Sequence, residues 1–297
     1  MTTAAAPSAS GSAARRLPLA VGDWPLVAPM AILFVGFFLG PLALLAWVSL
    51  HNDIEMTEVG LGSWMKFLGD PFYLNVALDT VLLGFKTVAL TLVLGVPMAL
   101  LFLSAGPRVR GLLLFLIVLP LLLSVVVRTF AWIVILGREG LVNTLAMDLG
   151  LTATPLRLLQ TELGLVIALA QIELPLMLLP LLAVMGRIDP NVLDASMALG
   201  ASRFRTFFKV ILPLSLPGII AGCLLVFASS TAAFISQSVI GGGRLIYMPL
   251  IIWQQSIVVY NWPFAAVVSI ALLVSVLAIL ALISALGRLA QGAAHAR

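Results

Sequence analysis

Charged residues are scarce in this sequence. Asp, Glu, Lys and Arg make up 9% of its 297 residues, whereas a soluble domain contains about 25%. Cysteine and histidine are scarcer still. The single Cys223 excludes a disulfide within the chain, and His51 and His295 are too far apart in sequence to suggest a metal site. Hydrophobic residues reach 62%, so the composition predicts an integral membrane protein and indicates no metal site, no cofactor and no thiol chemistry.

Motifs for catalysis are also missing. A nucleotide-binding loop requires Gly-x-x-x-x-Gly-Lys followed by Ser or Thr, and none of Lys66, Lys86 and Lys209 has glycine before it. The sequence contains no His-Glu-x-x-His zinc motif and no Gly-x-Ser-x-Gly elbow. We therefore expect no catalytic residue, and this chain is not itself an ATP-driven motor. The net charge of +4 does not indicate nucleic-acid binding, because the placement of basic residues relative to a bilayer explains it.

Long apolar runs dominate the rest of the chain. If one crossing takes about 20 apolar residues, the sequence predicts an all-α membrane protein with six transmembrane helices, at 26–50, 76–104, 112–136, 163–185, 219–240 and 264–286. Several of these spans contain proline. Proline is tolerated where neighbouring helices satisfy the freed carbonyl groups, so we expect the spans to pack as a bundle.

The distribution of Lys and Arg predicts the orientation. With the N-terminus inside, ten of the 16 Lys and Arg residues fall on the inner side, four on the outer side and two within spans. The positive-inside rule then predicts that both termini are cytoplasmic. We expect residues 1–22 to be a disordered cytoplasmic segment, 23–287 to form the transmembrane domain and 288–297 to be a cytoplasmic tail. Short apolar patches predict helices at the outer surface in three connections, 51–75, 137–162 and 241–263.

The polar segment 186–218 interrupts the apolar runs and carries several positive charges. Asp189 and Pro190 predict a helix start, and Gly200 predicts its end. Ser202 predicts a second start, followed by an apolar face that would anchor the helix under the bundle until Pro213 and Pro217 stop it. That face comprises Phe204, Phe207, Phe208 and Ile211. From these features alone, a knob that meets a partner and an ordinary amphipathic connecting loop are both open interpretations.

Four ionisable residues lie within or at the edges of the predicted spans: Asp79, Lys86, Arg128 and Glu173. Charges are costly in a bilayer, so we expect each to face the bundle interior, a water cavity or an opposite charge. Asp79 and Lys86 share a helix face but are two turns apart, too far for a direct pair, and Asp79 fits an outer-interface position. Arg128 and Glu173 fit a structural ion pair between successive spans, although Glu173 also fits a carboxylate that meets a cationic substrate.

A polar stripe marks the fifth predicted span, and it suits either a pathway lining or hydrogen bonds between helices. The stripe comprises Ser229, Ser230, Thr231, Ser236, Gln237 and Ser238. Together with the interior charges, it defines a candidate translocation pathway of Arg128, Glu173, Ser229, Ser230 and Gln237.

The polar segment resembles a motif of a known family. Asp194-Ala195-Ser196, three residues, Gly200 and ten residues to Ile211-Leu212-Pro213 resemble the EAA motif in permease subunits of bacterial ABC importers of the type I fold. Asp194 replaces the family's Glu and Ser196 its second Ala, which keeps an acid and a small residue. Further segments resemble the branch that includes spermidine/putrescine permeases of the PotB and PotH kind, at 128–132, 137–143, 187–190 and 261–265.

The resemblance implies a permease subunit in the bacterial inner membrane that moves a small organic solute by alternating access. A polyamine is the first expectation, and an opine, a phosphonate or another small solute are alternatives. The implied partners are a cytoplasmic ATPase dimer, a second permease subunit that is a copy or a paralogue, and a soluble solute-binding protein outside. The residues that would couple the permease to the ATPase are Asp189, Pro190, Asp194, Ala195, Ser196, Gly200 and Ala201.

Two functions of other classes compete with this expectation. An ion-coupled secondary transporter would require acidic relay residues near the midplane of repeated halves, and Glu173 is the one plausible candidate in a sequence without a visible repeat. A purely structural membrane subunit would have no use for the polar stripe or the charges within spans. The sequence favours the importer subunit over both.

Overall fold

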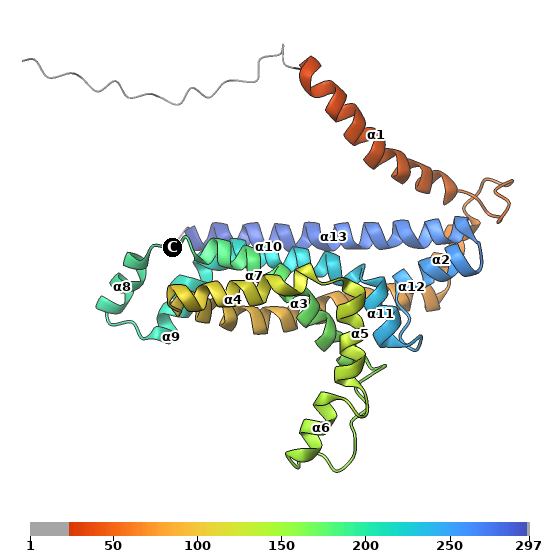
Figure 1. Ribbon diagram of the computed structural model, residues 1–297. Coiled ribbons are helices and arrows are strands. Elements are labelled where there is room, and N and C mark those ends of the chain that lie inside the picture. Colours follow the sequence, from red (N-terminus) through yellow and green to blue (C-terminus); the bar gives the residue numbers. More distant parts are fainter. Residues whose placement is uncertain (1–23, 296–297) are drawn as a thin grey trace, which may run out of the picture. The chain divides into compact units, whose positions relative to one another are not determined.

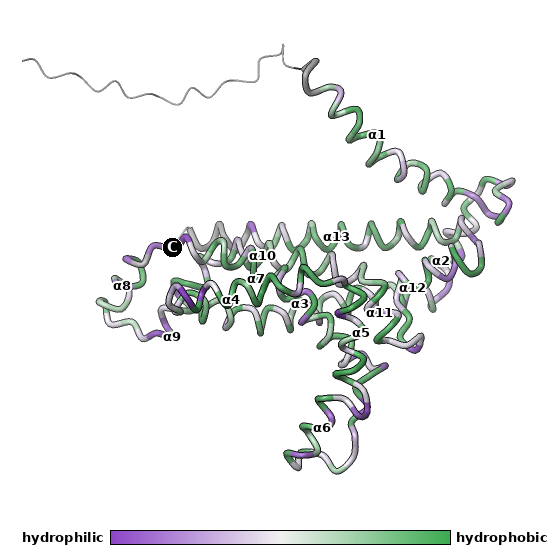
Figure 2. Tube along the Cα trace, viewed as in Figure 1, coloured by the Kyte–Doolittle hydropathy of each residue, from purple (hydrophilic) through white to green (hydrophobic). Residues whose placement is uncertain are grey.

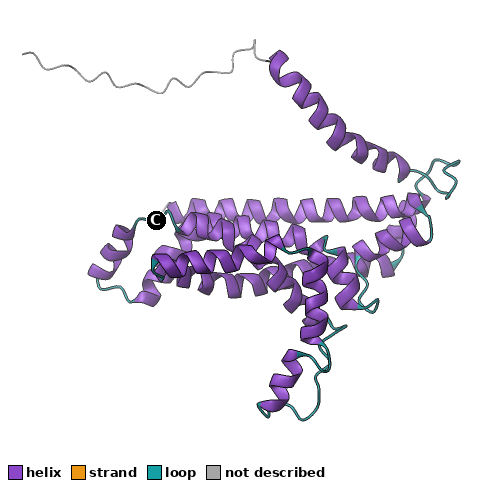
Figure 3. Ribbon diagram, viewed as in Figure 1, coloured by secondary structure: helices purple, strands orange, loops and turns teal. Residues whose placement is uncertain are grey.

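The computed structural model describes residues 24–295, which form helices and contain no β-strand (Figure 3). The expectations for residues 1–22 and 296–297 lie outside the described residues. The chain divides into two units, one that ends at Trp47 and one that begins at Val48, and each is considered by itself.

The first unit contains the helix α1, Trp24–Val48. Its stretch Ala28–Val48 is long and apolar enough to cross a membrane, and its residues are mostly hydrophobic in Figure 2. Pro29 and Pro41 lie inside the helix. A helix that is apolar around its whole circumference is suited to a lipid or protein surround rather than to water, so the first predicted span is confirmed as a helix.

The second unit contains the remaining helices, drawn in Figure 1. In chain order these are α2 (Gly62–Gly69), α3 (Pro71–Ser104), α4 (Pro107–Leu122), α5 (Val125–Leu136), α6 (Leu141–Asp148), α7 (Glu162–Met185), α8 (Pro190–Ala198), α9 (Arg203–Thr206), the π-helical turn η2 (Phe207–Ile211), α10 (Leu212–Thr231), α11 (Phe234–Gly241), α12 (Met248–Trp253), the π-helical turn η3 (Gln254–Val258) and α13 (Trp262–His295).

The centre of this unit is α7, which packs against α3 and α10. Glycines of α10 allow the close approach of α7. A Cβ atom added at Gly222 would lie 2.6 Å from the Met177 sulfur, and one added at Gly218 would lie 2.9 Å from the Pro180 carbonyl oxygen. Small residues at such contacts let helix backbones approach closely, and the resulting van der Waals packing is one of the forces that associate helices in a bilayer.

The third predicted span, 112–136, is not one straight helix. The helix α4 and the segment Val125–Asp148, which contains α5 and α6, meet at a bend of 103°, and the backbone leaves the helical conformation between them at Leu123 and Ser124. Among residues 24–295, five helices are long and apolar enough to span a membrane, and α4 with the segment Val125–Asp148 makes a sixth if the bent pair counts as one span. The predicted six-helix class is thus confirmed, with one span broken.

The fifth predicted span, 219–240, has wrong boundaries at both ends. The helix begins at Arg203 and continues through Pro213 and Pro217 to Thr231, so the prediction that these prolines stop it is wrong. The wider π turn η2 ends two residues before Pro213, where the proline ring and its missing N–H would otherwise disrupt α-helical bonding. The helix then breaks at residues 232–233, before α11.

Each of the three outer connections contains the predicted short helix: α2, α6 and α12. Helices α2 and α12 lie toward one end of the unit and α8 and α9 project at the other end, whereas α6 projects sideways from the bundle beyond α5 (Figure 1). The expected tail at 288–297 is helical as far as His295, as a continuation of α13. The cytoplasmic side of the termini stays a prediction.

Candidate functional site

The helix α8 has the caps that the sequence predicts. The Asp189 carboxylate accepts a hydrogen bond from the Asn191 N–H at 2.9 Å, and Pro190 occupies the first turn. At the other end, Gly200 has a φ of +82°. The Gly200 N–H donates to the Met197 carbonyl at 2.9 Å and the Ala201 N–H donates to the Ser196 carbonyl at 3.1 Å, the two bonds of a Schellman ending. The left-handed backbone at position 200 is the reason a glycine stands there.

The helix α9 is capped by Ser202, whose hydroxyl accepts from the Arg205 N–H at 3.3 Å. The two helices are joined by a hydrogen bond between the Ser196 and Thr206 hydroxyls, 3.0 Å apart. Since Thr206 is buried, this bond fixes the position of the middle of α8 relative to α9. The predicted first helix and the glycine turn of the knob are therefore present, but the second helix is not short, because α9 continues through η2 into α10 as far as Thr231.

The predicted aromatic anchor after Ser202 is only partly correct. Ile211 packs against the core around Leu181, but Phe204 is 74% exposed and Phe208 is 48% exposed. The two exposed rings pack on each other, with centroids 4.6 Å apart. The π turn over Phe207–Ile211 changes the residue period, so residues spaced for one α-helical face no longer share it.

The knob presents an uncovered apolar surface beside an acid. Leu199 is 89% exposed, and Asp194 and Ala195 are also exposed. Exposed apolar side chains that gather on a projecting element are typical of a protein interface. The surface is completed by Val192, Met197, Phe204 and Phe208.

The expected ion pair between Arg128 and Glu173 is not formed. Arg128 donates to the Ile172 carbonyl at 3.2 Å, and the groups that interact with the buried Glu173 carboxyl are the Ser229 hydroxyl and, at longer range, the Arg128 guanidinium. The Ile172 carbonyl of α7 thus accepts from the guanidinium that was expected to pair with the Glu173 carboxylate. Glu173 thus stays as a buried carboxyl where α7 packs against α10.

The polar stripe is divided by the helix break at 232–233. Gln237 on α11 donates from its amide nitrogen to the Ser230 carbonyl at 2.9 Å and to the Thr231 carbonyl at 3.3 Å, which satisfies the carbonyl end of α10. Ser236 pairs with Thr129 of α5 at 3.0 Å. These bonds fit the structural interpretation of the stripe. The amide oxygen of Gln237 nevertheless has no hydrogen-bond partner among the described residues, although the side chain is 1% exposed.

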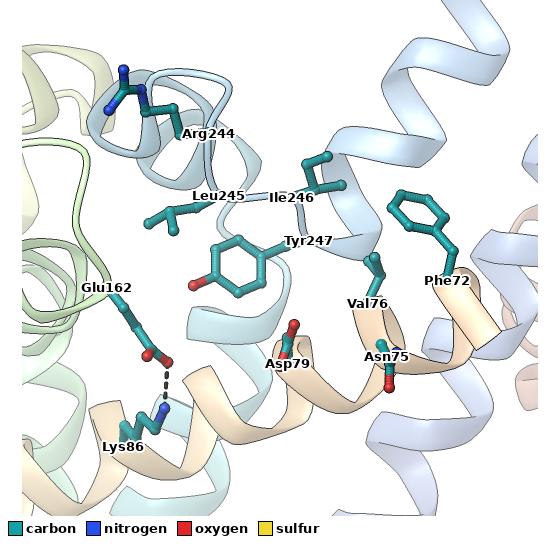
Figure 4. A pocket seen from close by; sticks show the side chains of 10 residues that line it. All are labelled: Phe72, Asn75, Val76, Asp79, Lys86, Glu162, Arg244, Leu245, Ile246 and Tyr247. Atoms are coloured by element: carbon teal, nitrogen blue, oxygen red, sulfur yellow. Dashed lines mark hydrogen bonds and ion pairs between the residues drawn. The ribbon is translucent and has the colours of Figure 1, made fainter.

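The ion pair that the described residues do form joins Lys86 of α3 to Glu162 at the start of α7. Both residues line a cavity of 360 Å³ together with Asp79 and Tyr247 (Figure 4). Burial and the Glu162 and Asp79 carboxylates raise the pKa of Tyr247 above its usual value. From the sequence alone, Glu162 falls in the outer connection and the pair is not predicted. The signal for it is the lysine within a span, which requires a carboxylate from another helix.

Comparisons with known proteins agree with this architecture. A family model described as "Binding-protein-dependent transport system inner membrane component" matches residues 91–289. The spermidine/putrescine transport system permease protein PotB of Haemophilus influenzae is 37% identical over 207 residues, which cover 70% of this chain and 72% of that protein. PotB of Escherichia coli is 35% identical over 203 residues, covering 68% and 74%.

Among solved structures, a chain of a bacterial ABC transporter involved in the import of the acidic polysaccharide alginate superposes with a TM-score of 0.71. The match covers 90% of this chain and 96% of the other at 18% sequence identity, so it bears on the fold alone.

Proposed function

This chain belongs to the family of binding-protein-dependent transport system inner membrane components, and on that basis we propose that it is the permease subunit through which an ATP-driven importer takes up a polyamine. The choice of cargo rests on one observation: the sequence of this chain is 37% and 35% identical to those of two spermidine/putrescine permeases. As a member of this family the chain is a multi-pass inner-membrane protein, and ATP hydrolysis belongs to a separate subunit. The proposed partners are an ATPase dimer, a second permease subunit and a solute-binding protein.

The interior of the bundle suits an ammonium group. Glu173 is buried where α7 packs against α10 and has no cation within 4 Å in the described part of the chain. A carboxylate in such a position is costly unless a positive charge reaches it. The Ser229 hydroxyl interacts with it, and the buried amide oxygen of Gln237 on α11 can accept a hydrogen bond. We assign Glu173, Ser229, Ser230 and Gln237 to the cargo pathway, with Arg128 holding the α5–α7 contact.

The knob formed by α8 and α9 is the proposed connection to the ATPase, within a coupling loop of residues 186–218 of a permease domain at 23–287. Asp189 and Pro190 start its first helix, and Gly200 and Ala201 turn the chain. Asp194 and Ala195 face the partner groove, while Ser196 seats α8 on α9 through its hydrogen bond with Thr206. The exposed apolar surface around Leu199 supplies an area that a partner can bury. When two ATPase subunits close on ATP, they would move the knobs and switch the bundle between its two accessible states.

The test is transport by the complex that co-purifies with an affinity-tagged chain, reconstituted in proteoliposomes with its solute-binding protein. We expect ATP-dependent uptake of radiolabelled putrescine or spermidine that unlabelled polyamine competes away. Glu173→Gln is expected to lower this uptake at least about tenfold, since it removes a buried charge contact, while the matched exposed change Glu55→Gln leaves it unchanged. Uptake of an anionic solute in place of polyamine would refute the cargo, and uptake driven by an ion gradient without ATP would refute the importer.

A further inference from the structure

A second cavity, of 380 Å³, lies apart from the proposed cargo pathway and the knob. Three arginines line it from three different segments: Arg138 in the turn after α5, Arg157 in the segment before α7 and Arg244 in the loop after α11. We propose that this three-arginine cavity binds carboxylate side chains of an acidic surface on the solute-binding protein. The inference rests on the proposed function, because it assumes a binding-protein partner.

A buried asparagine holds two of the arginines in place. Asn143 of α6 is fully buried. Its amide nitrogen donates to the Gly137 carbonyl at 2.8 Å and to the Leu156 carbonyl at 3.0 Å, while its amide oxygen accepts from the Leu156 N–H at 2.7 Å. Arg138 and Arg157 directly follow these two clamped residues. Their backbones are therefore fixed before any ligand arrives, which lowers the entropy lost on binding.

The third arginine is placed by a tight turn. Gly242 and Gly243 have φ values of +57° and +72°, and a Cβ atom at Gly242 would lie 2.8 Å from the Gln160 side chain. The Gln160 N–H donates to the Ile240 carbonyl at 3.1 Å, so the segment before α7 is bonded to the end of α11. The turn brings Arg244 to the same cavity as Arg157.

The three guanidinium groups lack anionic partners. None of them forms an ion pair or hydrogen bond among residues 24–295, and their residues are exposed. Arg244 also borders the neighbouring cavity, but in Figure 4 its guanidinium points away from the Glu162 and Asp79 side chains. Three like charges around one cavity repel one another, and a bound carboxylate relieves that repulsion. The paired N–H donors of a guanidinium also match the two oxygens of a carboxylate.

The position of the cavity favours a protein partner over a lipid headgroup. On α6, Leu141 and Leu145 are exposed on one face, and Asn143 lies on the opposite face, two residues from each. The leucine face suits the membrane surface, so the arginine segments held by Asn143 lie on the side away from it. The flanking helices α5, α6 and α11 also lie away from the end that carries α8 and α9 (Figure 1). A polyamine is an unsuitable ligand because the cavity repels cations.

The experiment measures the dissociation constant between the purified solute-binding protein and the complete importer in nanodiscs of neutral lipid. The variants are Arg138→Glu, Arg157→Glu and Arg244→Glu, singly and together. We expect each single change to raise the dissociation constant about tenfold and to weaken its dependence on salt. ATP hydrolysis without binding protein should not change. Lys66→Glu on α2 reverses an exposed charge outside the cavity and should change the constant by less than twofold.

Three results would overturn the inference. The first is a triple variant that binds the solute-binding protein as tightly as the wild type. The second is a wild-type importer that binds the solute-binding protein only when the nanodisc contains acidic lipid, which would assign the cavity to lipid headgroups. The third is unchanged protein binding with lost uptake, which would assign the arginines to cargo. A wild-type complex that binds no solute-binding protein at all would instead refute the proposed function, so the two failures are distinguishable.

Discussion

The strongest test of the knob is a substitution at Gly200, where the backbone conformation disfavours a larger residue although the surrounding space would hold one. The φ of +82° disfavours any residue with a Cβ atom, yet nothing lies within 4 Å of where that atom would be. The left-handed conformation costs an L-residue roughly 1–2 kcal/mol. That cost changes the population of the native ending of α8 by about 5- to 30-fold. Gly200→Val should therefore displace the end of α8 without any clash inside the subunit.

Coupling is the quantity to measure, as solute molecules imported per ATP hydrolysed by the reconstituted importer. We expect Gly200→Val to lower this ratio at least about fivefold, in line with that shift in population, while the complex still assembles in the membrane. Gly200→Asn should lose much less, because asparagine tolerates the left-handed region. Gly150 provides a matched control: its φ is +70° and nothing lies within 4 Å of its Cβ position, but it follows α6. Gly150→Val should leave coupling intact. Normal coupling in Gly200→Val would refute the role of this turn.

Three further predictions concern local contacts. Asn143→Leu removes three buried hydrogen bonds, and at about 1 kcal/mol each it should lower the stability of the complex by about 3 kcal/mol in thermal unfolding; a loss below about 1 kcal/mol would contradict the clamp. Lys86 and Glu162 are about half exposed, so a double-mutant cycle with Lys86→Gln and Glu162→Gln should give a coupling energy of about 1 kcal/mol or less. Hydrogen bonds from Thr57 and Glu58 lower the pKa of Asp53 to about 2; the turn should be stabilised above pH 4 or so and lose this contribution as the pH falls through about 2, whereas Thr57→Ala should raise the pKa of Asp53 in NMR titrations.

The sequence was sufficient for features whose cause lies within a few residues. Asp189, Ser202 and Gly200 cap or end the helices of the knob as predicted, because capping bonds join residues that are two to five positions apart. The apolar runs likewise predicted the membrane class and most spans, since a bilayer requires about 20 apolar residues at each crossing. The EAA-like motif predicted the family that residues 91–289 match.

Tertiary structure alone decided how distant groups meet. Lys86 pairs with Glu162 rather than with a group on its own helix, Arg128 donates to a backbone carbonyl instead of pairing with Glu173, and three arginines from separate connections line one cavity. The breaks in the third and fifth spans belong with these features, because apolar residues on either side of a bend read as one continuous run. Hydropathy and local spacing carry no information on helix packing and backbone direction, and those two properties determine which polar groups lie together inside and around this bundle.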